Sequence, residues 1–553
     1  MGRKWRRTDV RAHERLHRSD LQGFLRSAGV RPYASAMPRV VLLALISLSL
    51  IAAGCGAGTS AGGDDPASAV PAKAAFYVDA TVRPEGDLRE DALAAAGKVL
   101  RTSDPQARID ELVGQAFAET EDPKFDYEKD VAPWLGEKVA IWGSSATGEE
   151  DFRGAVVVAT TDEDEAQSAI DRAVKASDKT FSKRDYKGVE YQASADSAVG
   201  IVEGFAVAGT EPEFKQTVDA AKGDGLASTD RFKKAMDGLE DDRLGSFYLD
   251  FKAVLDAAIR QDPESAQQIE QAKQLFPVDK IGAVAGAFMA DGERLAIDAT
   301  AQIPEGALPA GVGSLYSGGT TPLLAELPGD SWVAFGAPDF GPALKGIYQQ
   351  VAGALGGAAI ENQLRQELGL DLQQDVFSWI GDVAVFARGT TPDTVEGGVV
   401  IEVTDPAKAE SAFGKLVGLA QSRGGVRARP VKIDGADAAF EAALPDAPKT
   451  VVAARSDDRV VIAFGRDAAA DALGGGEKLG DSDTYAAAKS VLGDVEPGFL
   501  VSVPAVLELI EAAGEADEDF AKAKPYLEAF GVIAGGSSRD GDTARSRTAA
   551  QLK

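Results

Sequence analysis

Two segments of the chain, 243 positions apart, share one pattern of apolar and polar residues. Each begins with an apolar run, at 155–161 (AVVVATT) and at 398–404 (GVVIEVT). Apolar residues then occupy positions i, i+3, i+4, i+7 and i+8, namely Ala166, Ala169, Ile170, Ala173 and Val174 in the first segment and Ala409, Ala412, Phe413, Leu416 and Val417 in the second. This spacing predicts a strand followed by an amphipathic helix that lies on a core.

Polar residues mark where both helices begin. Asp162 and Glu165 form a capping box, and Asp405 precedes Pro406 at the first helical position. Asp250 and Ser502 are predicted N-caps for the apolar helices that follow them.

Further matches between the two regions keep the same order along the chain. The matched pairs are 130–136 (DVAPWLG) with 375–381 (DVFSWIG), 247–250 (FYLD) with 499–502 (FLVS), and 301–303 (AQI) with 550–552 (AQL). Ordered matches at a nearly constant offset predict an internal duplication. We therefore expect two tandem copies of one domain, at 72–303 and 325–553, joined by the Gly- and Pro-rich linker 304–324.

Each copy is predicted to contain a fixed series of elements. The series is a strand, one or two helices, two adjacent strands, the amphipathic helix, a hairpin, two helices, a strand-helix unit and a final hairpin. Adjacent strands joined by short turns predict an α+β fold, with a mainly antiparallel sheet and helices packed on it. Strands such as 155–159 are apolar on both faces, which predicts that part of the sheet is covered twice.

The beginning of the chain has the pattern of an export signal. Residues 40–54 (VVLLALISLSLIAAG) are apolar and uncharged, follow Arg39, and are too short for the roughly 20 residues of a bilayer span. This pattern predicts a signal region at 1–54, in which Met37 is the expected translation start because 1–36 are rich in arginine.

Ala52-Ala53-Gly54-Cys55 resembles the bacterial lipobox, with Ala52 in place of the usual leucine. The resemblance implies that Cys55 carries diacylglycerol and that the protein is anchored by lipid to the extracytoplasmic face of the cell membrane. Residues 55–71 are then a lipidated cysteine with a flexible tether. An ordinary signal followed by a free cysteine is the alternative.

Charge and composition exclude several functions. Residues 1–54 hold 10 Lys/Arg and 3 Asp/Glu of the chain's 58 and 87, which leaves 48 − 84 = −36 for the remainder. A protein with this much negative charge repels the phosphate backbone of nucleic acid. Both histidines, His13 and His17, precede Cys55, so the mature chain would lack Ser-His-Asp and Cys-His catalysis. We expect no cofactor and no metal site.

The paired motifs supply the candidate ligand-binding or structural residues, which are Asp130, Trp134, Gly136, Asp375, Trp379 and Gly381. A tryptophan ahead of a glycine and an apolar strand is typical of a core anchor, and a ligand-stacking platform is the alternative. The aspartates are expected to cap or tie the adjacent turn, with catalysis as the alternative.

The Asp-x-x-Pro-Trp-Leu-Gly motif, the lipoprotein-like start and the FYLD segment resemble domain-of-unknown-function family 3352. That resemblance implies a bacterial, often actinobacterial, envelope lipoprotein, and it implies no activity. The second copy departs from the motif at Ser378 and at Val501-Ser502.

Three functions remain open at this point. The first is a non-catalytic binding or scaffold protein of the cell envelope. The second is a carrier for a lipid or another apolar ligand, since strands apolar on both faces would lie beside a membrane. The third is a carboxylate-based hydrolase of envelope glycans, which needs two acidic groups roughly 5–10 Å apart across a cleft.

Overall fold

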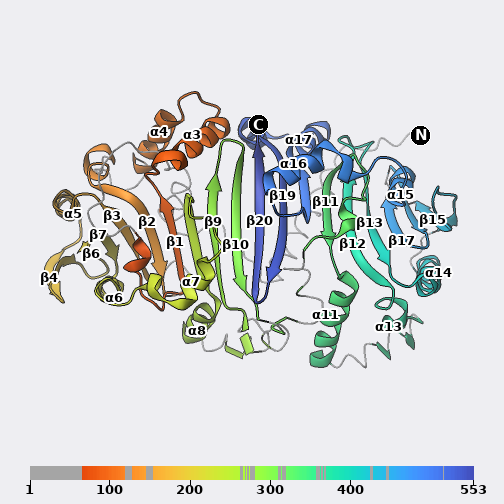
Figure 1. Ribbon diagram of the computed structural model, residues 1–553, viewed down its shortest axis with the longest axis horizontal. Coiled ribbons are helices and arrows are strands. Elements are labelled where there is room, and N and C mark those ends of the chain that lie inside the picture. Colours follow the sequence, from red (N-terminus) through yellow and green to blue (C-terminus); the bar gives the residue numbers. More distant parts are fainter. Residues whose placement is uncertain are drawn as a thin grey trace, which may run out of the picture.

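The computed structural model describes residues 65–553, apart from 119–126, 145–152, 262–265, 268, 271–272, 274–279, 305, 309–312, 314–318, 356–360, 363–364, 367–368, 424–426, 444–447 and 515. The described strands form one 20-stranded sheet, and every pairing in it is antiparallel. Figure 1 shows the sheet spread across the molecule, with helices around it. The predicted α+β class with a mainly antiparallel sheet is confirmed.

The first half of the chain contains strands β1 to β10. Its elements are η1 (Pro66–Ser68), β1 (Phe76–Thr81), α3 (Gly86–Leu100), α4 (Pro105–Ala118), η2 (Tyr127–Val131), β2 (Leu135–Gly143), β3 (Gly154–Thr160), α5 (Glu163–Ala176), β4 (Ser182–Tyr186), β5 (Val189–Ala193), β6 (Ala198–Val202), β7 (Phe205–Gly209), α6 (Glu211–Ala221), η3 (Leu226–Ser228), α7 (Asp230–Met236), β8 (Gly245–Asp250), α8 (Phe251–Gln261), β9 (Ala283–Ala290) and β10 (Arg294–Gln302).

The second half contains strands β11 to β20. Its elements are η5 (Pro322–Leu324), β11 (Ser331–Ala337), α11 (Phe340–Leu355), α13 (Leu372–Asp375), β12 (Ile380–Arg388), β13 (Glu396–Val403), α14 (Pro406–Arg423), β14 (Arg429–Pro430), β15 (Ala438–Ala443), β16 (Thr450–Arg455), β17 (Arg459–Phe464), α15 (Arg466–Ala472), η6 (Leu479–Asp481), α16 (Asp483–Leu492), β18 (Phe499–Ser502), α17 (Val503–Ala512), α18 (Glu518–Leu527), β19 (Phe530–Asp540) and β20 (Thr543–Leu552).

The strand pairings follow the same order in both halves, counted inward from each outer edge. The first half runs β4-β5-β6-β7-β3-β2-β1-β8-β9-β10. The second half runs β14-β15-β16-β17-β13-β12-β11-β18-β19-β20. Strands β10 and β20 pair from Arg294 to Gln302 and join the halves at the centre of Figure 1, a junction that we call the seam.

A buried ion pair lies at the middle of the seam. Asp298 on β10 pairs with Arg547 on β20, and the two positions differ by 249, the offset that relates 301–303 to 550–552. The Nε and Nη2 atoms of Arg547 donate to the two carboxylate oxygens of Asp298 at 2.7 and 2.6 Å. Matching positions of the two halves thus meet as opposite charges, each side chain 12% exposed.

One face of the sheet, which we call the covered face, carries the main cores. In the first half, Trp142 and Val157 of the sheet are buried together with Phe214 of α6 and Phe232 of α7. In the second half, strand residues including Leu500 are buried with residues of α15 and α16. Cross-strand partners share a face, so the pairings place Asp298 and Arg547 on the covered face as well.

The opposite face, which we call the open face, is packed by the amphipathic helices only at its outer strands. The apolar residues of α5 cluster with Trp134 and Ala206, and those of α14 cluster with Trp379 and Val460. The predicted helix starts are confirmed, because Asp162 accepts a hydrogen bond from the Glu165 amide at 2.9 Å and α14 begins at Pro406.

The packed part of each half begins earlier than predicted. Residues 66–70 were expected within the tether 55–71, yet Ala67, Ala69 and Val70 are fully buried. The carboxylate of Asp65 caps the turn by accepting from the Ala67 amide at 3.0 Å. Likewise, the expected linker 304–324 ends in the buried turn η5. Small apolar residues among glycines made both stretches resemble flexible chain.

Two further details differ from the prediction. The single hairpin expected after each amphipathic helix is a set of four strands, β4 to β7 and β14 to β17. Asp250 accepts from the Ala253 amide at 3.1 Å as a predicted cap, whereas Ser502 makes no side-chain cap. The predicted signal region 1–54, with Met37, lies outside the described residues, and so does Cys55. No helix within the described ranges is long and apolar enough to cross a membrane.

Candidate binding surface

The tryptophans of the paired motifs occupy equivalent positions in the two halves. Trp134 lies just before β2, and Trp379 lies just before β12. The indole N–H of Trp134 donates to the backbone carbonyl of Asp130 at 2.6 Å, and that of Trp379 donates to the carbonyl of Asp375 at 2.9 Å. Both rings are buried against a helix, so their faces contact protein.

The aspartates of these motifs each bind a cation on the following helix. Asp130 accepts from Arg172 on α5 at 3.1 Å, and Asp375 accepts from Lys415 on α14 at 2.7 Å. Burial disfavours the charged form of Asp375, but the hydrogen bond from Lys415 holds the pKa of this carboxyl below its ordinary value. Each motif therefore ties the start of a strand to a helix.

Gly136 and Gly381 lie where their strands pass close to a neighbouring chain segment. A Cβ on Gly136 would stand 2.8 Å from the backbone of Ala159, and one on Gly381 would stand 2.6 Å from the carboxylate of Glu402. Neither position has room for a side chain unless its surroundings move. All six motif residues therefore contact neighbouring parts of the protein, and their geometry is that of residues that pack a strand against a helix and an adjacent strand.

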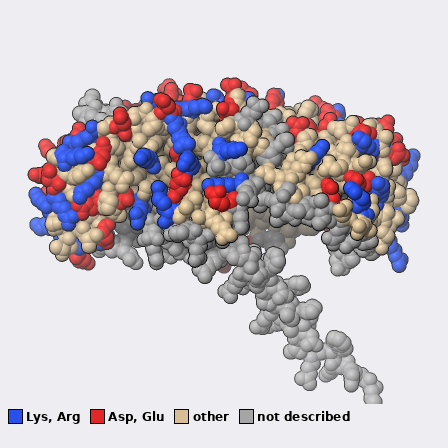
Figure 2. Space-filling view, turned by 90° about the horizontal axis from the view of Figure 1, so that it is seen from below, with Lys and Arg blue, Asp and Glu red and all other residues tan. Residues whose placement is uncertain are grey.

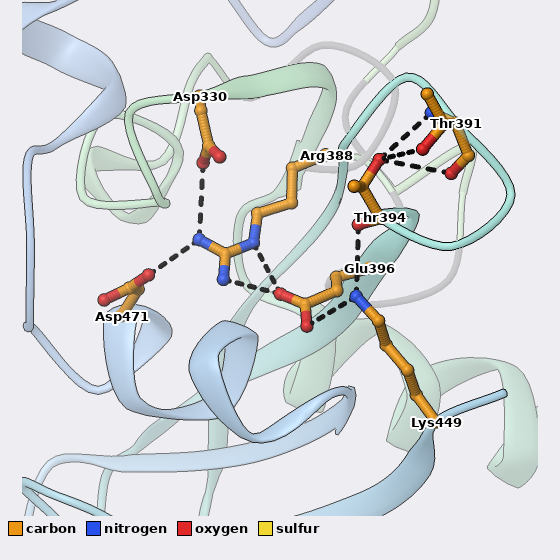
Figure 3. A network of polar contacts seen from close by, with 7 residues as sticks. All are labelled: Asp330, Arg388, Thr391, Thr394, Glu396, Lys449 and Asp471. Carbon is orange, nitrogen blue, oxygen red and sulfur yellow. Dashed lines mark hydrogen bonds and ion pairs between the residues drawn. The ribbon is translucent and has the colours of Figure 1, made fainter. Parts of the chain in front are cut away.

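A charged network joins β12 and β13 to α15 (Figure 3). The Nε and Nη2 atoms of Arg388 donate to one oxygen of Glu396 at 2.9 and 2.6 Å, and Nη1 donates to Asp471 at 2.6 Å. Lys449 donates to the other Glu396 oxygen at 2.9 Å. Burial opposes the ionisation of Glu396, but Lys449 and Arg388 hold its pKa below the ordinary value. A carboxylate so held serves structure and is poorly suited to proton transfer.

Asp79 on β1 is buried on the covered face and makes no ion pair with any described residue. Its carboxylate accepts a hydrogen bond from Ser246 on β8. Burial raises the pKa of this carboxyl above its ordinary value. Because the group is enclosed by the core, it does not form the open pair of carboxylates that glycan hydrolysis requires. Within the described ranges, no group of three or more His, Cys, Asp or Glu could hold a metal ion.

A band of uncharged residues crosses the open face, with one residue on each of successive strands. Direct cross-strand partners point to the same side of a sheet, and Phe247 and Phe288, which are diagonal neighbours, are joined by a ring contact with centroids 5.9 Å apart. It runs through Val156, Ile141, Val78, Phe247, Phe288, Ile297, Thr548, Gly535, Phe499, Phe335, Val385, Val399 and Ile462. We call these residues the apolar band. At about 4.8 Å per strand it is roughly 55–60 Å long.

Two phenylalanines of the apolar band lie flat across a neighbouring glycine. A Cβ on Gly286 would collide with the ring of Phe247, and one on Gly535 would collide with the ring of Phe499. The two glycines are 249 positions apart, so the same arrangement occurs on each side of the seam. These glycines allow the rings to cover the adjacent strand.

The apolar band accounts for most of the large apolar side chains that are exposed. Nine such residues are exposed among those described, and six belong to the band, at 36% to 51% exposure: Val156, Phe288, Ile297, Phe335, Val385 and Ile462. The band contains no charged residue, although charged residues make up 26% of the chain. Figure 2 shows Lys, Arg, Asp and Glu side chains intermixed over one long side of the molecule. Exposed apolar residues aligned in this way are typical of interaction or ligand-binding surfaces.

The comparison with protein families agrees with the resemblance seen in the motifs. The family model described as "Protein of unknown function (DUF3352)" matches residues 36–511. The chain belongs to this family. The family's description assigns no activity to DUF3352 proteins.

The other comparisons add no function for the DUF3352 chain. Three similar solved structures are titled as crystal forms I, III and IV of TP0453, each 12% identical. Their TM-scores are 0.24, 0.22 and 0.23, and the match covers 43–44% of this chain and 79–81% of those chains. Likeness at this level supports no argument here. No curated protein matches the chain.

Sequence reasoning about this DUF3352 protein selected the paired motifs and missed the apolar band. The available signal is that strands such as 155–159 are apolar on both faces, which predicts coverage on both sides. Val156 and Val158 both point to the open face, but α5 packs only near Val158. Which part of that face stays open depends on where the helix lies, and no local pattern encodes this.

Proposed function

We propose that this protein is a non-catalytic binding protein of the cell envelope, held at the membrane by a lipid on Cys55, and that it binds an apolar ligand along the apolar band. The observation that carries the proposal is the continuity of the band across the seam. Isolated exposed apolar residues are common on soluble proteins, but an aligned series on thirteen strands, with an apolar side chain on each strand except β19 and β20, is not.

The charge pattern favours an uncharged, apolar occupant. No member of the apolar band is charged, and the chain as a whole carries a formal charge of −29. Such a body repels anionic lipid head groups and other acidic surfaces. Hydrocarbon is the chemistry that gains most from a charge-free surface, so we assign the band to acyl chains.

The location is supported by the sequence around Cys55. A signal-like segment ends at this cysteine, and the packed body begins at Asp65, leaving a tether of about ten residues. Two acyl chains on one cysteine hold a protein firmly to a bilayer. Mass analysis of the mature N-terminal peptide tests the anchor, because an unmodified thiol at Cys55 contradicts it.

We also propose that the two halves are tandem copies of one unit. The support is that both halves have the same strand order from edge to seam. The sequence matches fall on equivalent elements, since the paired motifs run into the first residues of β2 and β12, and the FYLD and FLVS segments lie in β8 and β18.

The absence of enzymatic activity is part of the same proposal. The predicted mature chain has no histidine, and Glu396, Asp375 and Asp298 are each bound by cations. These groups stabilise the fold, and the hydrolase hypothesis gains no support from them.

The test compares two aspartate substitutions at exposed apolar positions. Phe335→Asp places a charge within the apolar band, and Leu416→Asp is the matched control on α14, outside the band. The two side chains are 51% and 42% exposed, so neither variant should lose stability through its core. Binding of a pyrene-labelled alkane to the purified full chain is measured by fluorescence titration.

We expect wild type and Leu416→Asp to bind the alkane equally and Phe335→Asp to bind at least about tenfold more weakly, since a charge must be desolvated. Equal binding by all three proteins, or none by wild type, contradicts the proposal. If wild type binds no alkane, the apolar band is better explained as a contact surface for a protein partner, as in a scaffold.

A further inference from the structure

On the open face near the seam, the two halves differ in the residue types at equivalent positions. Positions 249 apart are equivalent there, as Gly286 and Gly535 illustrate with their covering rings. At three other equivalent positions, the first half has an apolar residue and the second half has a hydroxyl. These pairs are Phe288 with Ser537, Ile297 with Ser546, and Ala299 with Thr548.

The three hydroxyl residues form one cluster, which we call the hydroxyl spot. Ser537 and Ser546 are direct cross-strand partners on β19 and β20, and Thr548 is the next residue of β20 on the same face. Ser546 and Thr548 are exposed. Within the described part of the chain, none of the three hydroxyl groups makes a hydrogen bond, so their donors and acceptors are free for a ligand.

The hydroxyl spot lies at the midpoint of the apolar band. The band crosses six strands on one side of β20, from β10 to β3, and six on the other, from β19 to β17. Each arm is roughly 29 Å long at about 4.8 Å per strand. A polar centre with two apolar arms matches a molecule that has one polar head and two hydrocarbon chains.

The head group that fits this centre is uncharged. Neither the spot nor the band contains a Lys or Arg that could pair with a phosphate or carboxylate, and Arg539, the next residue of β19 on this face, donates to the carbonyl oxygens of Gly541 and Ile303. Serine and threonine hydroxyls can both donate to ester oxygens and accept from a ligand hydroxyl.

We propose that the ligand is a neutral two-chain lipid of the diacylglycerol class. Its glycerol hydroxyl and ester oxygens lie on the hydroxyl spot, and one acyl chain follows each arm of the apolar band. This inference rests on the proposed function and adds the polarity and orientation of the ligand to it.

The test measures head-group preference separately from chain binding. Wild-type full chain is titrated with pyrene-labelled diacylglycerol and with a pyrene-labelled alkane of the same chain length. The double variant Ser546→Ile, Thr548→Ala gives the second half the residues of the first. Ser538→Ala is the control, because Ser538 is an exposed neighbour on β19 that points to the covered face.

We expect wild type and the control to bind diacylglycerol about tenfold more tightly than the alkane, as two or three hydrogen bonds would give. In the double variant this preference should fall to about one, because diacylglycerol loses its hydrogen bonds to Ser546 and Thr548. Equal binding of both probes by wild type, or an unchanged preference in the double variant, overturns the inference alone. Failure of wild type to bind either probe overturns it together with the proposed function.

Discussion

At the scale of single residues, the buried charges fall into two kinds. Most buried carboxylates, such as Glu396 and Asp375, are held ionised by an ion pair with an Arg or Lys side chain. Asp79 differs, because its described partner is the hydroxyl of Ser246 and burial raises its pKa. The second half has Gly336 at the matching position, so the fold does not require a carboxylate there.

Asp79→Asn should therefore raise stability at neutral pH. A carboxyl whose pKa is raised in the folded state contributes stability below its unfolded pKa and loses it as the pH rises through the folded value. We expect a gain on the order of 1 kcal/mol in the free energy of unfolding at pH 7, the size of a common stabilising substitution. Urea titrations at several pH values should show the gain shrinking towards pH 3, and a loss at pH 7 contradicts this account.

At the scale of elements, much of the fold could be predicted from the sequence. The amphipathic helices, their caps and the strands beside them were found because their signals are local and occur twice. The turn η1 and the four-strand sets were missed because short strands and buried alanines give weak periodicity. The apolar band could be predicted only as strands with two apolar faces, since its continuity depends on which strands pair.

The packing of rings over glycines yields a prediction at this scale. Gly535→Ala should destabilise the protein by about 1–3 kcal/mol, because the new methyl group collides with the ring of Phe499. Gly414→Ala in α14 is the control, because a Cβ there meets nothing within 4 Å and alanine favours helix by about 1 kcal/mol. Thermal unfolding of both variants is the measurement. If Gly535→Ala leaves the stability unchanged, the ring of Phe499 can move aside without cost, which contradicts this prediction.

At the scale of the whole molecule, the seam makes one sheet out of two halves. Arg547 reaches both halves, since it binds Asp298 and Glu240 of the first and the carbonyl oxygen of Leu492 of the second. A symmetric pairing would place identical residues at this point, and like charges there would repel. The sequence could not reveal this pair, because nothing local indicates that β10 meets β20.

Removing the cation of this pair should be costly, and removing both charges should cost less. Arg547→Met leaves Asp298 buried without its partner, for an expected loss of about 3–5 kcal/mol. Adding Asp298→Leu should recover more than half of that loss. Arg101→Met is the control, because the exposed pair of Arg101 with Glu528 should contribute at most about 1 kcal/mol. Additive losses in the double variant would exclude strong coupling across the seam.

The central claim is that the apolar band holds a lipid, and native mass spectrometry of protein extracted from its own membrane tests it most directly. Beyond any covalent lipid on Cys55, wild type should carry a non-covalently bound uncharged species with the mass of a two-chain lipid. This species should be absent from Phe335→Asp and present in Leu416→Asp. Wild type without a non-covalent lipid-sized adduct, or an adduct of this kind that Phe335→Asp retains in full, would contradict the account.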